Sequence, residues 1–393
     1  MSTIMFLRQI SNHANLRTSF RVFQRAASSA TNTGISSTTL LYERDPQPQF
    51  TDPETQKLLK SMTQLQLDKI FQKTTVADNS VDYKLMTVEM LEEEFRKSIE
   101  RAKKRLQMPP VVQMKKDERR IISNDSALSG FSDTKYVITD ITYGLRQSER
   151  KVVVRQTDGT LEYAPMEITK RMHQLYFPLN GRSIRIPRMF EDEHLQRCLD
   201  EQKYLFILNR MVVQFDPFEP EFHYISSRVY QHINETKQFD ALRSTRHFGP
   251  MTFFFAWHRC IDDLLYDMVR RDYLQNATEL IALLYKLHNM ESNYKDVLKR
   301  VDEIKPQEDL ALKELEKELK RTSKDVKEDI QSTIGKTQVD FEVDDLCLPF
   351  IEDYISKHAL KKVQLELATQ TIKEINAEKR QLFEGLNKVH GIS

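Results

Sequence analysis

Cysteine, histidine and paired carboxylates are the residues of this chain whose types and spacing could support catalysis or metal binding. Cys260 follows His258 by two positions, which would suit a redox or metal role, but a packed thiol beside a helix-surface imidazole explains the pair more simply. Asp262-Asp263 is better explained as a solvated helix face, because adjacent helical side chains point ~100° apart. Asp344-Asp345 lacks the alternating ligands and central glycine of a calcium loop.

Motifs for nucleotide binding and hydrolysis are absent from the sequence. The chain has nine glycines in 393 residues, and no two are close enough for a G-x-G-x-x-G or P-loop phosphate cradle. The histidines never reach HExxH spacing, and no G-x-S-x-G elbow occurs. We therefore expect no enzyme activity, no cofactor, no metal and no small-molecule substrate. Unbroken apolar runs such as Phe253–Trp257 and Leu280–Tyr285 are far too short to cross a bilayer, so we also expect no membrane span.

Basic residues cluster in residues 95–120, where ten Lys or Arg stand against three acids. Such a local excess is what phosphate neutralisation requires, and we expect this cluster to contact RNA. The alternative is a solvated face whose bases only complement the helix dipole. The RNA-contacting residues predicted here are Lys103, Lys104, Arg105, Lys115 and Lys116.

A second basic stretch, residues 168–188, contains five Lys or Arg and no acid. From it we predict RNA contacts by Arg182, Arg185 and Arg188, with Tyr176 and Phe177 nearby as rings for base stacking. A solvated face is again the alternative.

Periodicity and turn residues predict an α+β fold, in which a small antiparallel sheet with flanking helices precedes a mainly α-helical C-terminal half. The expected regions are a mitochondrial presequence at 1–42, an N-terminal helical arm with a basic cluster at 43–120, a small α+β region at 121–190, an α-helical domain at 191–290, a charged solvated helix or linker at 291–345, and a C-terminal helix at 346–393.

Local signals place the first elements. Thr51–Glu54 has capping-box order and predicts a helix, and a second helix is expected from Thr87, with one buried stripe from Leu91 to Leu106 and a stop at Pro109-Pro110. Strands are expected at Lys135–Tyr143 and on both sides of the Asp158-Gly159 turn. A helix is expected over 166–176 and a further short strand at 183–186.

Helices are expected to dominate after Glu191. One is predicted over 195–211, one over 222–233, one over 251–268 with Leu264 or Leu265 in the core, and one that is capped at 276–279. The acidic stretch Gln338–Tyr354 is expected to face solvent or basic proteins. The last helix is expected over 351–386 and should dock through Leu360, Val363, Leu367, Ile372 and Ile375.

Residues 1–42 differ chemically from the rest, with four arginines, thirteen Ser or Thr and no acid before Glu43. This composition is typical of a mitochondrial presequence, and we expect import to remove it between Arg25 and Glu43. Without the four arginines, 55 Lys and Arg face 58 Asp and Glu, so the mature chain carries net charge −3. RNA contact must therefore depend on local clusters.

Several of these segments together resemble the mitochondrial small-subunit ribosomal protein family numbered twenty-two. The segments are Tyr83–Thr87, Leu91–Glu93, Ala102-Lys103, Arg105–Val111, Thr134–Val137, Thr139–Ile141, Tyr176–Pro178, Gly181-Arg182, Leu242–Gly249 and Arg270–Asp272. The similarity covers about residues 45–290 and departs from the pattern after Asn289.

The resemblance implies an architectural component of the mitochondrial small ribosomal subunit, which holds ribosomal RNA and neighbouring ribosomal proteins together in the matrix and supports translation without catalysis. Two alternatives remain from the residues alone. One is a non-ribosomal mitochondrial helical-hairpin protein that binds transcripts or assembly partners, and the other is a matrix enzyme with an unrecognised site.

Overall fold

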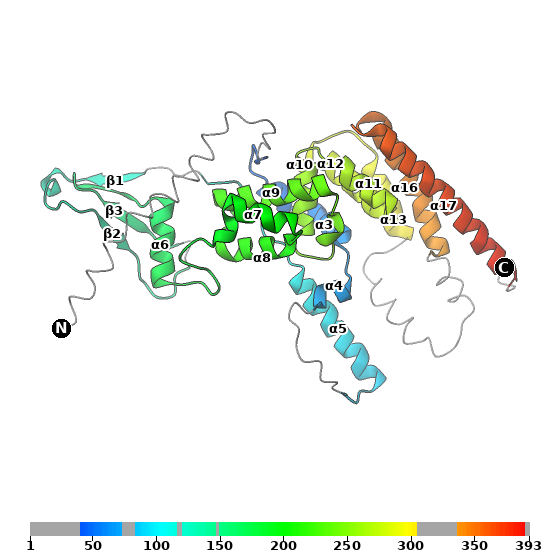
Figure 1. The fold of residues 1–393 in the computed structure, drawn as a ribbon, viewed down its shortest axis with the longest axis horizontal. Helices are drawn as coiled ribbons and strands as arrows, with labels where there is room; N and C mark the ends of the chain where they lie inside the picture. Colours follow the sequence, from blue (N-terminus) through cyan, green and yellow to red (C-terminus); the bar gives the residue numbers. More distant parts are fainter. Residues whose placement is uncertain (1–39, 73–82, 116–119, 147–148, 305–335, 390–393) are drawn as a thin grey trace. The chain divides into compact units, whose positions relative to one another are not determined.

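The computed structural model describes residues 40–72, 83–115, 120–146, 149–304 and 336–389 (Figure 1). The presequence expected at 1–42 lies almost wholly outside these residues, as do Lys116 and most of the charged stretch expected at 291–345. The elements confirm an α+β fold with a small antiparallel sheet and a mainly helical C-terminal half.

Four helices form the N-terminal part of the described chain, and local capping explains where two of them begin. They are α2 (Gln47–Thr51), α3 (Pro53–Thr63), α4 (Leu67–Phe71) and α5 (Val88–Arg105). The predicted capping box is wrong by one residue: Thr51 ends α2, and the Asp52 carboxylate caps α3 by accepting a hydrogen bond from the Thr55 backbone N–H at 3.1 Å.

Helix α5 begins where the sequence predicts. The Thr87 hydroxyl accepts a hydrogen bond from the Met90 N–H at 3.3 Å, and α5 ends before the prolines. The predicted buried stripe is correct only for its second half, because Ile99 and Ala102 are buried whereas Leu91 is 44% exposed. The apolar side chains of the first turn, Val88, Met90 and Leu91, are therefore exposed in the described chain.

The sheet has four short antiparallel strands in the order β1-β4-β3-β2. They are β1 (Ile121–Asn124), β2 (Tyr136–Thr139), β3 (Val152–Arg155) and β4 (Thr160–Tyr163), followed by α6 (Met166–Tyr176). Strands β3 and β4 flank Asp158-Gly159, which confirms the predicted hairpin. The strand predicted at 135–143 is shorter than expected and is limited to β2. No strand forms at 183–186. There the Gln214 side chain of α8 (Tyr204–Gln214) bonds the N–H and the carbonyl of Ser183, in the place of a neighbouring strand.

Gly159 permits the hairpin turn, and it yields a testable prediction. Its φ is +85°, and a Cβ there would lie 2.0 Å from the Asp125 carbonyl oxygen. Gly130 also has positive φ, +76°, but its Cβ would meet nothing within 4 Å. Both glycine-to-alanine changes carry the backbone strain, so we expect Gly159→Ala to cost about 1–3 kcal/mol more than Gly130→Ala in denaturant unfolding. Equal losses would show that the close approach to Asp125 is absent.

Short helices joined by tight turns build the central helical part. They are η4 (Arg188–Phe190), α7 (Asp192–Asp200), α8 (Tyr204–Gln214), α9 (Pro220–Thr236), η5 (Phe239–Ala241), α10 (Phe248–Trp257), α11 (Asp262–Arg270) and α12 (Leu274–Leu287). The helix predicted over 195–211 is divided into α7 and α8, and the helix predicted over 251–268 is divided into α10 and α11. The breaks lie at Gln202 and Arg259, which both adopt a positive φ of 56°. Helix α12 also begins two residues before its predicted cap at Asn276, which lies inside the helix.

The core of this part is apolar and lies between the consecutive helices. Every residue of α10 is buried, and its Phe253 ring meets the Phe50 ring edge-on, with 5.2 Å between centroids. Leu264 and Leu265 are both fully buried, as the sequence predicts. The hydrophobic run of α10 is therefore a packed core helix. Among the described residues, no helix combines the length and hydrophobicity that a membrane crossing requires.

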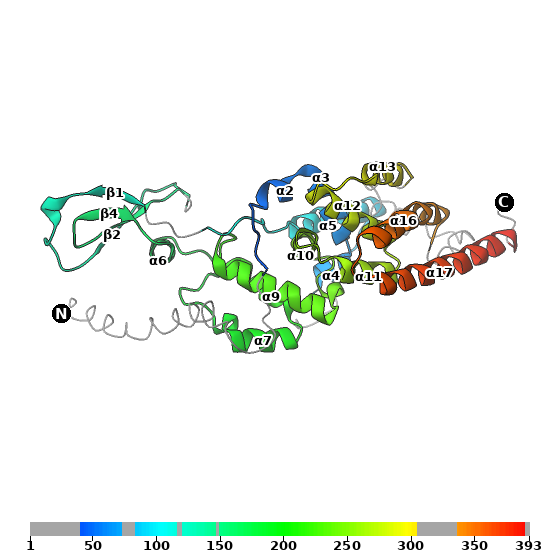
Figure 2. The ribbon, with the colours of Figure 1, turned by 90° about the horizontal axis from the view of Figure 1, so that it is seen from above.

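The C-terminal elements are α13 (Tyr294–Ile304), α16 (Gln338–Lys357) and α17 (Lys362–Val389), of which α16 and α17 lie side by side (Figures 1 and 2). The predicted docking face of the last helix is mostly wrong. Leu365, Thr369 and Ile372 face the core, whereas Val363 and Leu367 are 77% and 69% exposed. Leu360 is also exposed, and Ile375 is only partly covered.

Candidate nucleic-acid interface

The predicted basic cluster lies at the end of α5, beside a groove. Lys103, Lys104 and Arg105 occupy the last turn of α5 and are exposed. The groove has a volume of about 610 Å³ and lies between the end of α4, the end of α5, α8 and the turn before α10. Lys69, Lys104, Arg105 and Arg246 supply its cations, and no Asp or Glu lines it. A groove of this charge would attract an anion such as a phosphate.

The cations of the groove differ in how firmly they are held. The Arg105 guanidinium donates to the Ile70 carbonyl at 3.1 Å and lies 4.7 Å from the centre of the Phe71 ring, so it fastens α4 to α5. Lys69 pairs with Asp240 at 2.9 Å. Lys103 and Lys104 make no ion pair within the described residues, and they are the cations best placed to meet an anion from outside.

Arg246 lines the groove and lies between two buried polar residues of the same segment, Arg243 and His247. Its guanidinium donates twice to the Asn209 side-chain oxygen, at 3.1 and 2.7 Å. The neighbouring His247 is fully buried, and desolvation lowers its pKa to about 3, so the imidazole is neutral at physiological pH. Arg243, three residues before Arg246, is also buried, and its guanidinium lies 5.1 Å from the centre of the Phe248 ring and 4.7 Å from that of the Tyr273 ring.

Residues 106–115 form a strap that leads from α5 toward the sheet. Met108 packs against Gly249, where a Cβ would lie 2.3 Å from the Met108 Sδ. At the far end of the strap, the Lys115 backbone N–H donates to the Phe218 carbonyl at 3.0 Å, and the Lys115 ammonium lies 5.1 Å from the centre of the Phe218 ring. Lys115 is thus exposed and held in place, while Lys116 lies outside the described residues.

The second predicted cluster lies on the loop that follows α6, which holds Arg182 and Arg185, and at the first residue of η4, Arg188. The Arg182 guanidinium donates to both carboxylate oxygens of Asp216, at 3.2 and 2.8 Å, so its charge is already compensated inside the chain. Arg210 donates to the Gly181 carbonyl at 2.7 Å and holds the same loop on α8. Arg185 and Arg188 are exposed. The phosphate contact predicted for this cluster therefore rests on Arg185 and Arg188, with Arg182 as the residue that positions the loop.

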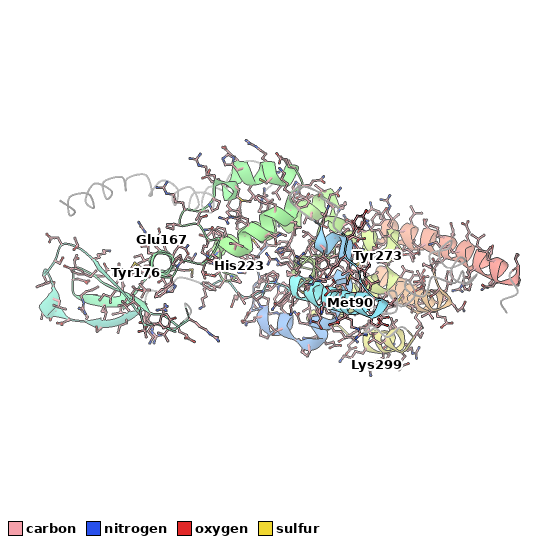
Figure 3. The ribbon with its side chains drawn as sticks, turned by 90° about the horizontal axis from the view of Figure 1, so that it is seen from below. Met90, Glu167, Tyr176, His223, Tyr273 and Lys299 are labelled. Atoms are coloured by element: carbon pink, nitrogen blue, oxygen red, sulfur yellow. The ribbon has the colours of Figure 1, made fainter. Side chains whose placement is uncertain are left out.

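The two rings predicted to stack on bases differ in exposure. Tyr176, at the end of α6 (Figure 3), is 56% exposed. The Phe177 ring is covered by the Arg150 guanidinium, which lies 3.5 Å from its centre. Tyr176 alone is free to stack on a base from outside.

The residues first considered for catalysis have structural partners. The Cys260 thiol contacts the His258 carbonyl, and burial lowers the pKa of His258 to about 4. The expectation of a solvated face at Asp262-Asp263 is wrong for Asp262, which is buried and accepts hydrogen bonds from the Tyr354 hydroxyl and from the Leu360 and Lys361 backbone N–H groups. In the described ranges, no three His, Cys, Asp or Glu side chains gather where a metal ion could bind.

Sequence reasoning missed two groove residues, Lys69 and Arg246. Neither lies in a basic run, so charge counting along the chain could not find them. Arg246 does lie in Leu242–Gly249, one of the segments that carry the family resemblance, and the Arg105–Val111 segment faces it across the groove. The signal available in the sequence was that both segments carry the family resemblance.

This fold and this groove define a class of protein that is mainly helical, carries a small sheet and has a groove lined by cationic side chains. A family model described as "Mitochondrial 28S ribosomal protein S22" matches residues 48–289, and the chain belongs to this family. It is 40% identical over 241 residues to the small ribosomal subunit protein mS22 of Bos taurus, across 61% of this chain and 67% of the relative. The protein of the same name from Mus musculus is 39% identical over the same shares.

Proposed function

We propose that this chain is an architectural component of the mitochondrial small ribosomal subunit and that it bridges ribosomal RNA and neighbouring ribosomal proteins in the mitochondrial matrix. Family membership supports the ribosomal role and a mitochondrial location. The relatives are named as ribosomal proteins, so a non-ribosomal transcript-binding protein is not favoured. The role requires binding and positioning, and it assigns no catalytic residue to this chain.

One observation supports the RNA contact in particular. The groove beside α5 joins Lys104 and Arg105 to Lys69 and Arg246 without a single acid in its lining, although the whole chain carries 58 Asp and Glu. Cations held by a rigid scaffold lose little conformational freedom when they pair with phosphates. Arg185, Arg188 and Lys115 are further exposed cations that can meet the same RNA, and Lys116 belongs to this proposed set.

Charge reversal of the two lysines tests the proposal. Lys103→Glu with Lys104→Glu leaves Arg105 in place, so α4 stays fastened to α5. We expect the double variant to fold normally and to leave the small subunit at lower salt than the unmodified chain, because each lost phosphate contact removes about one unit from the salt slope of binding.

A matched pair of cations provides the control. Lys299 and Arg300 are adjacent and exposed on α13, and Lys299→Glu with Arg300→Glu makes the same change of charge away from the groove. Retention of each chain is measured on salt-containing sucrose gradients. Equal retention of the two double variants at every salt concentration contradicts a phosphate contact at Lys103 and Lys104, and would leave the helix-dipole explanation.

A further inference from the structure

The two faces of the sheet differ in burial along β3 and β4. Side chains alternate along each strand, and Val152, Val154, Thr160 and Glu162 form the buried face. The opposite face, called the open face below, consists of Tyr136 and Ile138 on β2, Val153 and Arg155 on β3, and Leu161 and Tyr163 on β4. Tyr136 is 50% exposed and Ile138 is 51% exposed, while the other four are partly covered.

Strand register arranges the open face as two rows across the sheet. Tyr136 pairs with Arg155, which pairs with Leu161, and this makes the first row. Ile138, Val153 and Tyr163 make the second row in the same way. Arg120 extends the second row: its carbonyl accepts a hydrogen bond from the Tyr163 N–H at 3.0 Å, and its guanidinium lies 5.6 Å from the centre of the Tyr163 ring.

The charge of the open face is positive. Lys151, Arg155 and Arg120 are its cations, since Lys151 shares the alternation of Val153 and Arg155. The register brings one carboxylate near them, that of Asp140, which accepts hydrogen bonds from the Thr142 N–H and hydroxyl at 2.9 and 2.6 Å. These bonds lower the pKa of Asp140 and hold its charge against the following turn. Two rings and three cations therefore share one surface, of which Tyr136, Lys151 and Arg120 are the exposed members.

We infer that the open face binds unpaired bases of RNA. Flat aromatic and guanidinium groups on a sheet offer stacking surfaces for splayed bases, and nearby cations pair with the phosphates between them. A protein partner fits less well, because it would bury the charge of Arg155. The Arg155 guanidinium donates to the neutral Gly159 carbonyl at 3.3 Å, which does not compensate that charge. The inference rests on the proposed ribosomal RNA contact, but it uses different residues and a different form of RNA from the groove.

Removal of the two rings tests the open face in the isolated full chain. Binding is measured by fluorescence anisotropy with two probes: a short labelled single-stranded RNA of mixed sequence, and the same strand annealed to its complement. We expect Tyr136→Ala with Tyr163→Ala to weaken single-strand binding ~10-fold or more and to leave duplex binding unchanged. A 2-aminopurine base in the single strand should be quenched by the unmodified chain and not by the double variant.

Two controls separate stacking from other effects. Tyr136→Phe with Tyr163→Phe keeps both rings and should bind the single strand as the unmodified chain does. Tyr83→Ala removes a ring that is 91% exposed outside the sheet and should change nothing. The inference is overturned if the unmodified chain fails to bind the single strand, or if a folded Ala double variant binds it equally well; a protein occupant of the open face gives these results. Normal single-strand binding by a chain that fails to sediment with the small subunit would instead contradict the proposed function.

Discussion

Replacement of Lys336 by methionine is expected to lower the free energy of unfolding by about 3–5 kcal/mol. Lys336 is buried, and its ammonium donates to Asp272 at 2.6 Å, to Asp344 at 2.5 Å and to the Asn376 side-chain oxygen at 2.8 Å. These partners lie in the turn before α12, on α16 and on α17. Loss of the ammonium would leave the buried Asp344 carboxylate without its cation, beside Asp272, which also pairs with Lys379 at 3.1 Å.

A second change should recover part of that loss. Asp344→Asn in the Lys336→Met background removes the uncompensated carboxylate, so the double variant should be more stable than Lys336→Met alone. Urea unfolding of the unmodified chain, both single variants and the double variant measures the coupling between the two residues. Strictly additive losses would show that Lys336 and Asp344 do not stabilise each other, and that α16 is held in another way.

Glu279 makes the stability of the chain depend on pH. Its side chain is 1% exposed, accepts hydrogen bonds from the Ser61 hydroxyl and the Gln275 amide, and has a pKa raised to about 7 by burial. The folded chain therefore holds this proton more tightly than the unfolded chain, whose carboxyl has a pKa near 4.5. The stability that the neutral carboxyl contributes is fully present below pH 4.5 and is lost as the pH rises to about 7.

Glu279→Gln should remove this loss, because the amide has no proton to release. At pH 8 we expect the variant to be more stable than the unmodified chain by up to about 3 kcal/mol, while the two should be similar near pH 4.5. Glu374→Gln, at an exposed position on α17, is the control and should keep the pH dependence of the unmodified chain. If the stability of Glu279→Gln declines with pH as steeply as that of the unmodified chain, Glu279 is not the group that titrates.

Local chemistry explains which parts of the fold could be predicted. The Thr87 cap and the Asp158-Gly159 turn each depend on a few adjacent residues, and both are where the sequence places them. The helix breaks at Gln202 and Arg259 carry no such signal, because neither residue type favours the positive φ that it adopts. The prediction of the buried face of α17 was mostly wrong because α17 has two apolar stripes, and periodicity cannot tell which of them packs against the rest of the chain.

The candidate site was predicted less well than the fold, because side-chain partners distant in sequence decide what each cation does. Arg182 and Arg105 are bonded to Asp216 and to the Ile70 carbonyl, so their roles in positioning emerge only when the chain is folded. Asp344 was expected to face solvent or basic proteins with its acidic neighbours, and it is buried instead, where it pairs with Lys336. Charge counting located Lys103 and Lys104 but could not find Arg246 across the groove.

Sedimentation of this one chain in a mitochondrial lysate tests the central proposal most directly. The lysate is separated on a sucrose gradient at high salt, and each fraction is probed for the chain and for small-subunit ribosomal RNA. A resident architectural protein should sediment with the small subunit and remain there after the wash. The proposal is contradicted if the chain stays at the top of the gradient, apart from the RNA, while the small subunit itself sediments intact.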